Sequence, residues 1–343
     1  MRTYQIVTKP LMPKLGLKFM NDAGPAHAVT FDRRAIPAQA VETRFTLADG
    51  HMLRRIDWLM PAGTPRGSML FMPGRGDFYE KYLETLDYWH CHGWRVTAAD
   101  WRGQAGSGRL GLDGVTGHVP DFSLWVSDLA DVWRRSAATG PGPRVLVAHS
   151  MGGHIALRAV AEGALRVDAV VLVAPMLGFL PQWMPARLLH LAARGMVRLG
   201  DPRRAAWRKS EKPAVLPADR ARLLTHDAGR YADEEWWRAT RPQLAMGTAS
   251  WGWVERALAS MRLLERPGVL EGVTAPVLIL AAERDGLVSM AAIRRAARRM
   301  PRAQLHAFGG ESRHEILREE DRVRDRALAA IDDFLDRMAP RED

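Results

Sequence analysis

The chain has 343 residues, a formal net charge of +10 at pH 7 and a pI near 10.3. Its composition, 47% hydrophobic and 26% charged, is that of a globular protein and excludes an intrinsically disordered one. The single cysteine, Cys91, excludes an internal disulfide framework and a multi-cysteine metal site, and it suits a reducing compartment. The basic excess is compatible with a nucleic-acid partner, an anionic membrane or an arginine-rich genome. Only six of the 49 basic residues are lysines, which favours the last.

The chain shows no targeting or membrane-spanning pattern. Pro10 and Pro13 interrupt the only apolar stretch near the start, whereas a signal peptide needs an unbroken apolar region of about 7–15 residues. The most apolar run, 169–180, is too short to span a bilayer and contains Pro175. We therefore expect a soluble, cytoplasmic protein.

Short apolar runs alternate along the chain with longer stretches of helical periodicity. The runs are rich in leucine or β-branched residues, which indicates buried strands. Predicted strands lie at 67–73, 94–100, 144–149, 168–174, 276–282 and 304–308. Predicted helices lie at 78–92, 121–138, 151–163, 289–300 and 316–338. This alternation predicts an α/β fold with a mostly parallel sheet and helices on both of its faces.

Two earlier strands are predicted at about 41–47 and 52–60. They flank Asp49-Gly50, a dipeptide that is typical of a hairpin turn. The expected sheet therefore has eight strands and opens with an antiparallel pair.

Residues 176–268 break this rhythm, because they contain helix-like stretches, many prolines and no convincing strand. We predict a helical cap (lid) insertion there and call it the cap segment. The α/β core is then expected at 41–175 and 269–338, and residues 1–40 are expected to form an N-terminal arm of unassigned role.

The strongest chemical motif is Val147-Ala-His-Ser-Met-Gly-Gly153, in which a predicted strand runs directly into a predicted helix. A serine at such a sharp turn is exposed at the carboxyl end of the sheet, and small residues two positions before and after it let strand and helix approach closely. Gly152 meets this demand, and Ala148 replaces the more usual glycine. Ser150 is therefore the candidate nucleophile; the alternative is a serine that only caps a helix.

A nucleophilic serine needs a base and an acid that orients the base, and in this arrangement they follow in the order Ser, acid, His. The strand at 276–282 leads into a turn that contains Asp285, with Glu283 as the rival acid. The strand at 304–308 is followed by His314. We predict Asp285 and His314 as the partners of Ser150; the alternatives are a turn aspartate and a histidine at a helix start.

Two backbone N–H groups are expected to form an oxyanion hole. The first is that of Met151, at the start of the helix behind Ser150. The second is that of Arg75, in the glycine-containing loop Met72-Pro-Gly-Arg-Gly-Asp77. The loop Asp100-Trp-Arg-Gly-Gln-Ala-Gly-Ser-Gly108 is assigned a structural role, and His149 is expected to point away from Ser150 because neighbours on a strand alternate faces. No cofactor or metal is predicted, since no cluster has metal-ligand spacing.

Three blocks carry a family resemblance: Pro73-Gly-Arg-Gly-Asp-Phe-Tyr-Glu-Lys-Tyr82, Asp100-Trp-Arg-Gly-Gln-Ala-Gly-Ser107 and His149-Ser-Met-Gly-Gly153. They resemble the lysophospholipase and monoacylglycerol lipase group of the α/β-hydrolase superfamily, above all its bacterial lysophospholipase L2-like members. Ala105 departs from the glycine that those relatives commonly have. The resemblance implies an α/β-hydrolase fold and a serine hydrolase that cleaves the acyl ester of a lysophospholipid or monoacylglycerol through an acyl-enzyme.

Other functions share this arrangement of residues. A short-chain carboxylesterase, a thioesterase and an aminopeptidase-like hydrolase would use the same triad, and a non-catalytic membrane-binding protein could keep the scaffold. The cap segment holds six of the twelve tryptophans, which suits either an acyl-chain tunnel or the segment's own core.

The cap segment also carries most of the charge: 16 basic and 9 acidic residues give it +7 of the total +10. The basic residues cluster at Arg194, Arg198, Arg203, Arg204, Arg208, Lys209 and Lys212. We predict that this face meets an anionic lipid surface or head group, with peripheral contact at the inner membrane face; the alternative is a solvated arginine-rich face. No nucleic-acid partner is expected.

Overall fold

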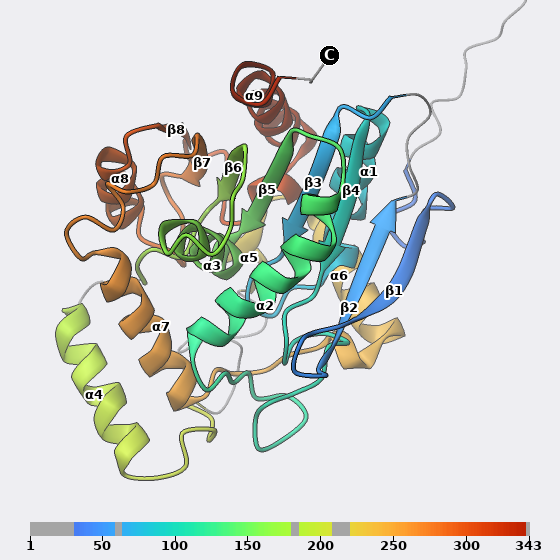
Figure 1. The fold of residues 1–343 in the computed structure, drawn as a ribbon. Coiled ribbons are helices and arrows are strands. Elements are labelled where there is room, and N and C mark those ends of the chain that lie inside the picture. Colours follow the sequence, from blue (N-terminus) through green and yellow to red (C-terminus); the bar gives the residue numbers. More distant parts are fainter. Residues whose placement is uncertain (1–30, 59–63, 180–184, 208–219, 341–343) are drawn as a thin grey trace, which may run out of the picture. The chain divides into compact units, whose positions relative to one another are not determined.

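The computed structural model describes residues 31–58, 64–179, 185–207 and 220–340. Within them lies an eight-stranded sheet in the order β1-β2-β4-β3-β5-β6-β7-β8 (Figure 1). The strands are β1 (Ala40–Thr46), β2 (Met52–Trp58), β3 (Gly67–Met72), β4 (Trp94–Ala99), β5 (Arg144–His149), β6 (Ala169–Val173), β7 (Val277–Ala282) and β8 (Ala303–Phe308). Each lies where the sequence predicts a strand.

The sheet is parallel except at its start, as predicted. Strand β2 runs antiparallel to both β1 and β4, and every other neighbouring pair is parallel. Gly50, in the turn between β1 and β2, has a φ of +85°, a conformation that glycine adopts without steric cost. The Asp49-Gly50 hairpin prediction is confirmed.

Helices cover both faces of the sheet. They are α1 (Leu83–Cys91), α2 (Phe122–Arg135), α3 (Ser150–Ala161), α8 (Met290–Arg299) and α9 (Asp321–Met338), with short 3₁₀ turns η1 (Tyr79–Tyr82), η2 (Ala137–Thr139) and η5 (Ile316–Arg318). In the view of Figure 1, α2 and α3 lie in front of the sheet and α1 lies behind it. Helix α9 lies beside α1, where Tyr88 Oη donates to Asp332 Oδ2 at 2.6 Å.

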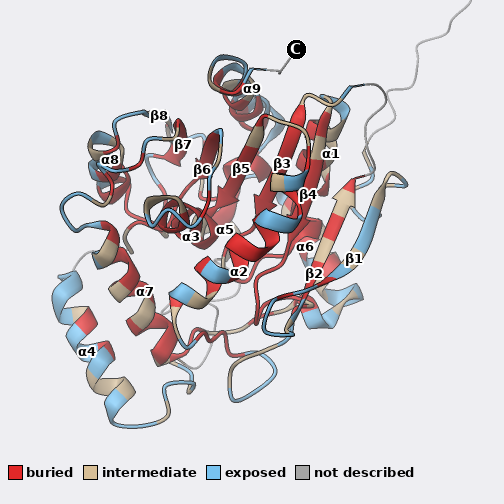
Figure 2. Cartoon of the chain, in the orientation of Figure 1, coloured by how far each residue is buried: buried red, intermediate tan, exposed pale blue. Residues whose placement is uncertain are grey.

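The middle of the sheet is the core. Every residue of β3, β6 and β7 is buried, as are all but the first of β5, whereas β1 at the edge is largely exposed (Figure 2). This explains why the central strands read as continuous apolar runs without alternation. The carboxyl ends of these strands are therefore rigid positions for side chains in the loops that follow.

The last predicted helix, 316–338, is wrong at its start. Residues Ile316–Arg318 form the 3₁₀ turn η5, and α9 begins only at Asp321. The chain is extended at Glu319, with ψ at 173°, and the carboxylate of this residue accepts from the backbone N–H of Arg313 at 2.7 Å. Periodicity could not reveal this break, because Ile316 and Leu317 are buried as helical residues would be.

Between β6 and β7, the described residues contain helices and no strand of the sheet. The elements are α4 (Ala186–Arg198), α5 (Arg220–Leu224), α6 (Ala228–Thr240), the 3₁₀ turn η4 (Pro242–Leu244) and α7 (Trp251–Leu264). Arg208, Lys209 and Lys212 of the predicted basic cluster, and residues 1–30 of the expected arm, lie outside the described residues. The division into arm, core and cap stays a prediction. In the part of the chain that the structure covers, no helix has the length and apolarity needed to cross a membrane.

Candidate active site

Ser150 lies at the junction of β5 and α3, as the motif predicts. Its φ is +51°, in the left-handed region that non-glycine residues rarely adopt and that marks sharp functional turns. The turn depends on a close approach of α3 to the loop after β3: a Cβ on Gly152 would lie 2.3 Å from the carbonyl oxygen of Pro73. Glycine is therefore required at 152 for the serine to stand where it does.

The structure brings the three predicted triad residues together. His314 Nε2 lies 2.9 Å from Ser150 Oγ, and His314 Nδ1 lies 2.7 Å from Asp285 Oδ2. Both distances are hydrogen-bond distances, and Asp285 and His314 are buried. This geometry can move a proton from the serine hydroxyl to the imidazole while the carboxylate holds the ring in one orientation.

Asp285 is held in its ionised form by its surroundings. Burial on its own would raise its pKa, but the attraction and hydrogen bond of His314 outweigh burial and lower it. The backbone N–H groups of Leu287 and Val288 donate to Asp285 Oδ1 at 2.7 and 3.1 Å, which adds to this effect. The rival acid, Glu283, instead pairs with Arg294 on the surface, so it does not serve His314 in this structure.

The two expected oxyanion donors belong to Met151 and Arg75. Met151 is in the first turn of α3, where backbone N–H groups have no partner inside the helix. Gly74, next to Arg75, touches the serine, since a Cβ there would lie 3.1 Å from Ser150 Cβ. The structure therefore places Met151 and the start of the Arg75 loop near the nucleophile, and the role of the two N–H groups stays a prediction.

The loop that carries Arg75 is supported from two sides. Gly76 donates its backbone N–H to Gln104 Oε1 at 2.7 Å, so the loop after β4 has the structural role expected of it. On the other side, Arg75 Nη2 donates to the carbonyl oxygen of Gly247 at 2.9 Å, and its guanidinium lies 5.1 Å from the centre of the Trp253 ring. Arg75 thus connects the expected oxyanion loop to the cap segment.

One histidine lies elsewhere than the sequence suggested. His149 packs its ring against that of His314, with 4.9 Å between ring centres, so it does not simply point away from the site. Its Nδ1 lies 3.0 Å from both Asp77 Oδ2 and Tyr82 Oη. The alternation rule fails here because His149 is the last residue of β5, where the chain already turns into the elbow.

Asp77 is a residue of this site that sequence reasoning missed. Besides His149 and Tyr82, it accepts from the backbone N–H of Gly74 at 3.1 Å and from Lys81 Nζ at 2.5 Å. Burial would raise the pKa of the Asp77 carboxyl, but Lys81 and His149 hold it well below its usual value. The one available signal was its place inside the Pro73–Tyr82 block.

Comparison with known proteins finds one matching family and several relatives. Residues 63–321 match the protein family described as "Serine aminopeptidase, S33". The chain is 34% identical to lysophospholipase L2 of Escherichia coli over 286 residues, covering 78% of the chain and 80% of that protein. It is 25% identical to monoacylglycerol lipase of Mycolicibacterium smegmatis over 249 residues, covering 72% and 80%.

A solved structure with a similar fold is that of a soluble variant of monoglyceride lipase from Saccharomyces cerevisiae, in complex with a substrate analogue. The TM-score is 0.70 at 18% identity, over 90% of this chain and 98% of that one. Monoacylglycerol lipase from Paleococcus ferrophilus has a TM-score of 0.63 at 20% identity, over 82% and 98%. These two likenesses support the fold.

Proposed function

The chain belongs to the serine aminopeptidase S33 family of α/β-hydrolases, and from this premise we propose that it hydrolyses the acyl ester of a lysophospholipid or monoacylglycerol. The observation that carries the proposal is the continuous hydrogen-bond chain from Ser150 through His314 to Asp285. The relatives named lysophospholipase L2 and monoacylglycerol lipase support the choice of substrate class.

The proposed reaction has two steps. Ser150 Oγ attacks the acyl carbonyl carbon while His314 Nε2 takes the hydroxyl proton, and the backbone N–H groups of Met151 and Arg75 hold the negatively charged carbonyl oxygen. The imidazolium then gives its proton to the departing alcohol, which leaves an acyl-serine. A water molecule, deprotonated by His314, attacks the acyl-serine, and the imidazolium gives this proton to Ser150 Oγ as the fatty acid leaves. Asp285 stabilises the imidazolium in both steps.

Labelling with a fluorophosphonate probe tests the nucleophile. We expect wild-type protein to be labelled on Ser150, and Ser150→Ala to lose labelling and hydrolysis together. Unlabelled, inactive wild-type protein would overturn the proposed function, and so would a fully active Ser150→Ala variant.

A substrate panel tests the substrate class. Lysophosphatidylcholine, a monoacylglycerol, a short p-nitrophenyl ester and an aminoacyl p-nitroanilide would be compared by kcat/KM. We expect the first two to be preferred. Turnover of the short ester alone would indicate a carboxylesterase instead. Preference for the anilide would indicate an aminopeptidase, the activity in the family's description.

We also propose that the residues of 176–268 act as a cap whose helix α4 contacts an anionic lipid surface. The outer face of α4 carries exposed leucines: Leu188 and Leu191 are 56% and 66% exposed, and Leu199, just past its end, is 83% exposed. The exposed arginines 187, 194 and 198 lie on the same face, three to four residues from Leu191 or from one another. Figure 2 shows α4 largely exposed, with the more buried α7 beside it. Exposed leucines and arginines on one helix suit contact with an anionic membrane interface.

A further inference from the structure

The loop that carries His314 is bound to the cap segment along its backbone. Glu315 donates its N–H to the carbonyl oxygen of Leu224 at 2.8 Å, and Thr225 Oγ1 donates to the carbonyl oxygen of Arg318 at 2.7 Å. Leu223, the residue before Leu224, lies against the turn that contains Asp285. A Cβ on Gly286 in this turn would be 2.6 Å from a methyl group of Leu223. Helix α5 and the residues after it therefore touch the turns of both His314 and Asp285.

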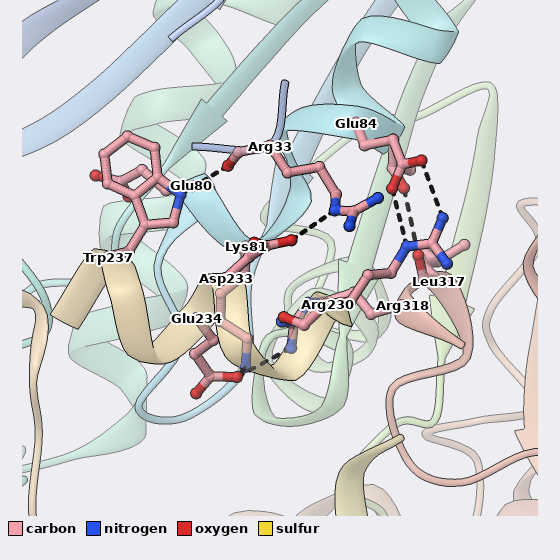
Figure 3. A pocket seen from close by; sticks show the side chains of 11 residues that line it. Arg33, Glu80, Lys81, Glu84, Arg230, Asp233, Glu234, Trp237, Leu317 and Arg318 are labelled. Carbon is pink, nitrogen blue, oxygen red and sulfur yellow. Dashed lines mark hydrogen bonds and ion pairs between the residues drawn. The ribbon is translucent and has the colours of Figure 1, made fainter. Parts of the chain in front are cut away.

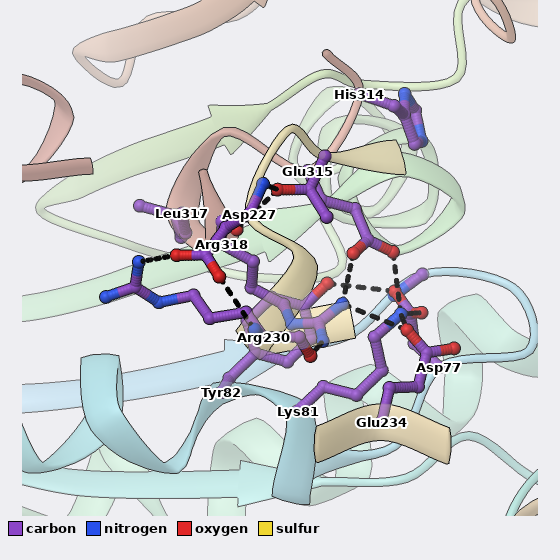
Figure 4. A network of polar contacts seen from close by, with 12 residues as sticks. Asp77, Lys81, Tyr82, Asp227, Arg230, Glu234, His314, Glu315, Leu317 and Arg318 are labelled. Atoms are coloured by element: carbon purple, nitrogen blue, oxygen red, sulfur yellow. Dashed lines mark hydrogen bonds and ion pairs between the residues drawn. The ribbon is translucent and has the colours of Figure 1, made fainter. Parts of the chain in front are cut away.

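A buried charge cluster lies beneath this contact. Lys81, whose side chain is wholly buried, binds three carboxylates at once: Asp77 at 2.5 Å, Glu315 at 2.6 Å and Glu234 at 3.0 Å. The three carboxylates come from different places, namely the expected oxyanion loop, the His314 loop and helix α6. Figure 4 shows the side chain of Glu315, the residue that follows His314, extending into the cluster.

Glu234 is the contribution of the cap segment to this cluster. It has no exposed surface, and it pairs with Arg318 at 3.0 Å, Arg220 at 2.7 Å and Arg238 at 2.9 Å as well as with Lys81. Burial would raise its pKa, but these cations hold the pKa of the Glu234 carboxyl well below its usual value. Arg318 also pairs with Glu315, so Glu234 reaches the residue beside His314 through two cations.

Further ion pairs anchor α6 to the core. Arg230 pairs with Glu84 of α1 at 2.9 Å, and Asp233 pairs with Arg33, in the segment before β1, at 2.6 Å; these four residues line a small polar cavity (Figure 3). Each charged side chain that lines this cavity has an ion-pair partner: Glu80 pairs with Arg54 and Arg241 outside it, and the others pair with one another. No bound group is needed to explain them. Helix α6 is thus held to the core independently of the cluster, which makes it a firm support for Glu234.

Ion pairs taken wholly out of water add little to stability, because desolvation of the charges offsets their attraction, but they are strongly directional. A cluster that joins α6, the expected oxyanion loop and the His314 loop is well suited to fixing geometry. We propose that Glu234 and Lys81 are positioning residues for His314: through Glu315 and Arg318 they hold its imidazole at bonding distance from Ser150. This rests on the proposed function, and it makes α6 a fixed wall of the site rather than part of a movable lid.

The isosteric change Glu234→Gln tests this proposal, with Glu235→Gln as its matched control. Glu235 is the next residue of α6, but its side chain is 52% exposed and it pairs only loosely with Arg220 and Arg238, at 4.0 and 3.7 Å. With a short soluble p-nitrophenyl ester as substrate, we expect Glu234→Gln to lower kcat about tenfold or more with KM within about twofold, because misplacing a base mainly slows the chemical step. Glu235→Gln should retain wild-type values.

The pH dependence of kcat/KM separates a change in charge from a packing defect, because a packing defect alone would not shift the profile along the pH axis. The titratable groups packed around His314 include Asp285 from the turn after β7, His149 from the end of β5 and Glu315 from its own loop. Glu234→Gln leaves the cations of the cluster in excess, which disfavours the imidazolium. The acid limb of the profile should therefore move to lower pH, by roughly half a pH unit.

Glu234→Asp keeps the charge and shortens the side chain, so it carries the test if Glu234→Gln does not fold. We expect it to lower kcat without moving the acid limb. A folded Glu234→Gln or Glu234→Asp variant with wild-type kcat and an unmoved acid limb would overturn this inference and leave the proposed function standing. Wild-type protein that hydrolyses no acyl ester would overturn the proposed function, and this inference with it.

Discussion

The backbone at Ser150 and Gly152 shows how closely single residues control the site. The serine is held at a φ of +51°, and Gly152 leaves room for the carbonyl oxygens of Pro73 and Met72, which a Cβ would approach to 2.3 and 2.8 Å. Ala105 has a φ of +42°, in the region that glycine adopts without steric cost. This explains why glycine is common at this position in the lysophospholipase L2-like proteins that the sequence resembles.

Gly152→Ala should therefore be harmful, although alanine is otherwise the better helix former. The added methyl group meets backbone atoms that cannot rotate away, so we expect a loss of about 1–3 kcal/mol in the free energy of unfolding and a lower kcat. Gly195→Ala in α4 is the control, because a Cβ there meets nothing within 4 Å; it should stabilise by up to about 1 kcal/mol. Denaturant unfolding measures both, and equal stabilities would contradict the close approach.

Asp285 and Glu283 can be told apart by isosteric changes. Asp285→Asn keeps the shape but removes the charge that stabilises the imidazolium, so we expect kcat to fall about 10³–10⁴-fold. Glu283→Gln should change kcat less than about twofold, because that carboxylate pairs with Arg294 instead. Steady-state kinetics on the short ester decide the matter, and a larger loss for Glu283→Gln would reverse the assignment.

At the scale of elements, helices α4 and α6 of the cap segment behave differently. Helix α6 is tied to α1 by the pair Arg230–Glu84 and to the His314 loop by the pair Glu234–Arg318. Helix α4 packs on α7, where buried His190 lies 2.9 Å from Glu255, and its opposite face is open. The same stretch of chain thus contains one helix bound by ion pairs and one helix with an open face.

Leu191→Gln tests the proposed lipid contact of α4. Burying one leucine side chain is worth roughly 1.5–3 kcal/mol, so we expect binding to anionic vesicles to weaken by about tenfold or more. Leu112→Gln is the control, since Leu112 is 53% exposed but lies outside α4. Cosedimentation measures the binding, which should weaken as salt is raised or anionic lipid removed. Vesicle binding that is unchanged by Leu191→Gln, by added salt and by removal of anionic lipid would count against the contact.

At the scale of the whole molecule, buried carboxylates tie distant parts of the chain together. The pKa values of Asp77, Glu234, Glu315 and Asp285 all lie below their ordinary values, because the attraction of nearby charged groups outweighs the opposing effect of burial. Groups whose pKa is lower in the folded state contribute stability that is present above their unfolded values and is lost as the pH falls through the folded ones.

We therefore expect the melting temperature to fall steeply below about pH 4, near the ordinary pKa of a carboxyl group. Asp100 acts in the opposite direction between about pH 4 and 7, because burial raises its pKa to about 7, so no comparable loss is expected there. Thermal unfolding followed at several pH values gives the test. A melting temperature that stays constant from pH 5 to pH 3 would show that the cluster is not ionised as described.

The sequence by itself determined the strands, the serine elbow and the order Ser150, Asp285, His314. Apolar runs, turn residues and chain order are local signals, and a parallel sheet brings the ends of its strands to one edge. Only the tertiary structure decided where α9 begins, that His149 packs against His314, and that Lys81 joins Glu315 to Glu234. Lys81 and Glu315 are 234 positions apart, and no periodicity or motif links a buried cation to carboxylates so distant in the chain. Such pairs exist only once folding has removed the water between them.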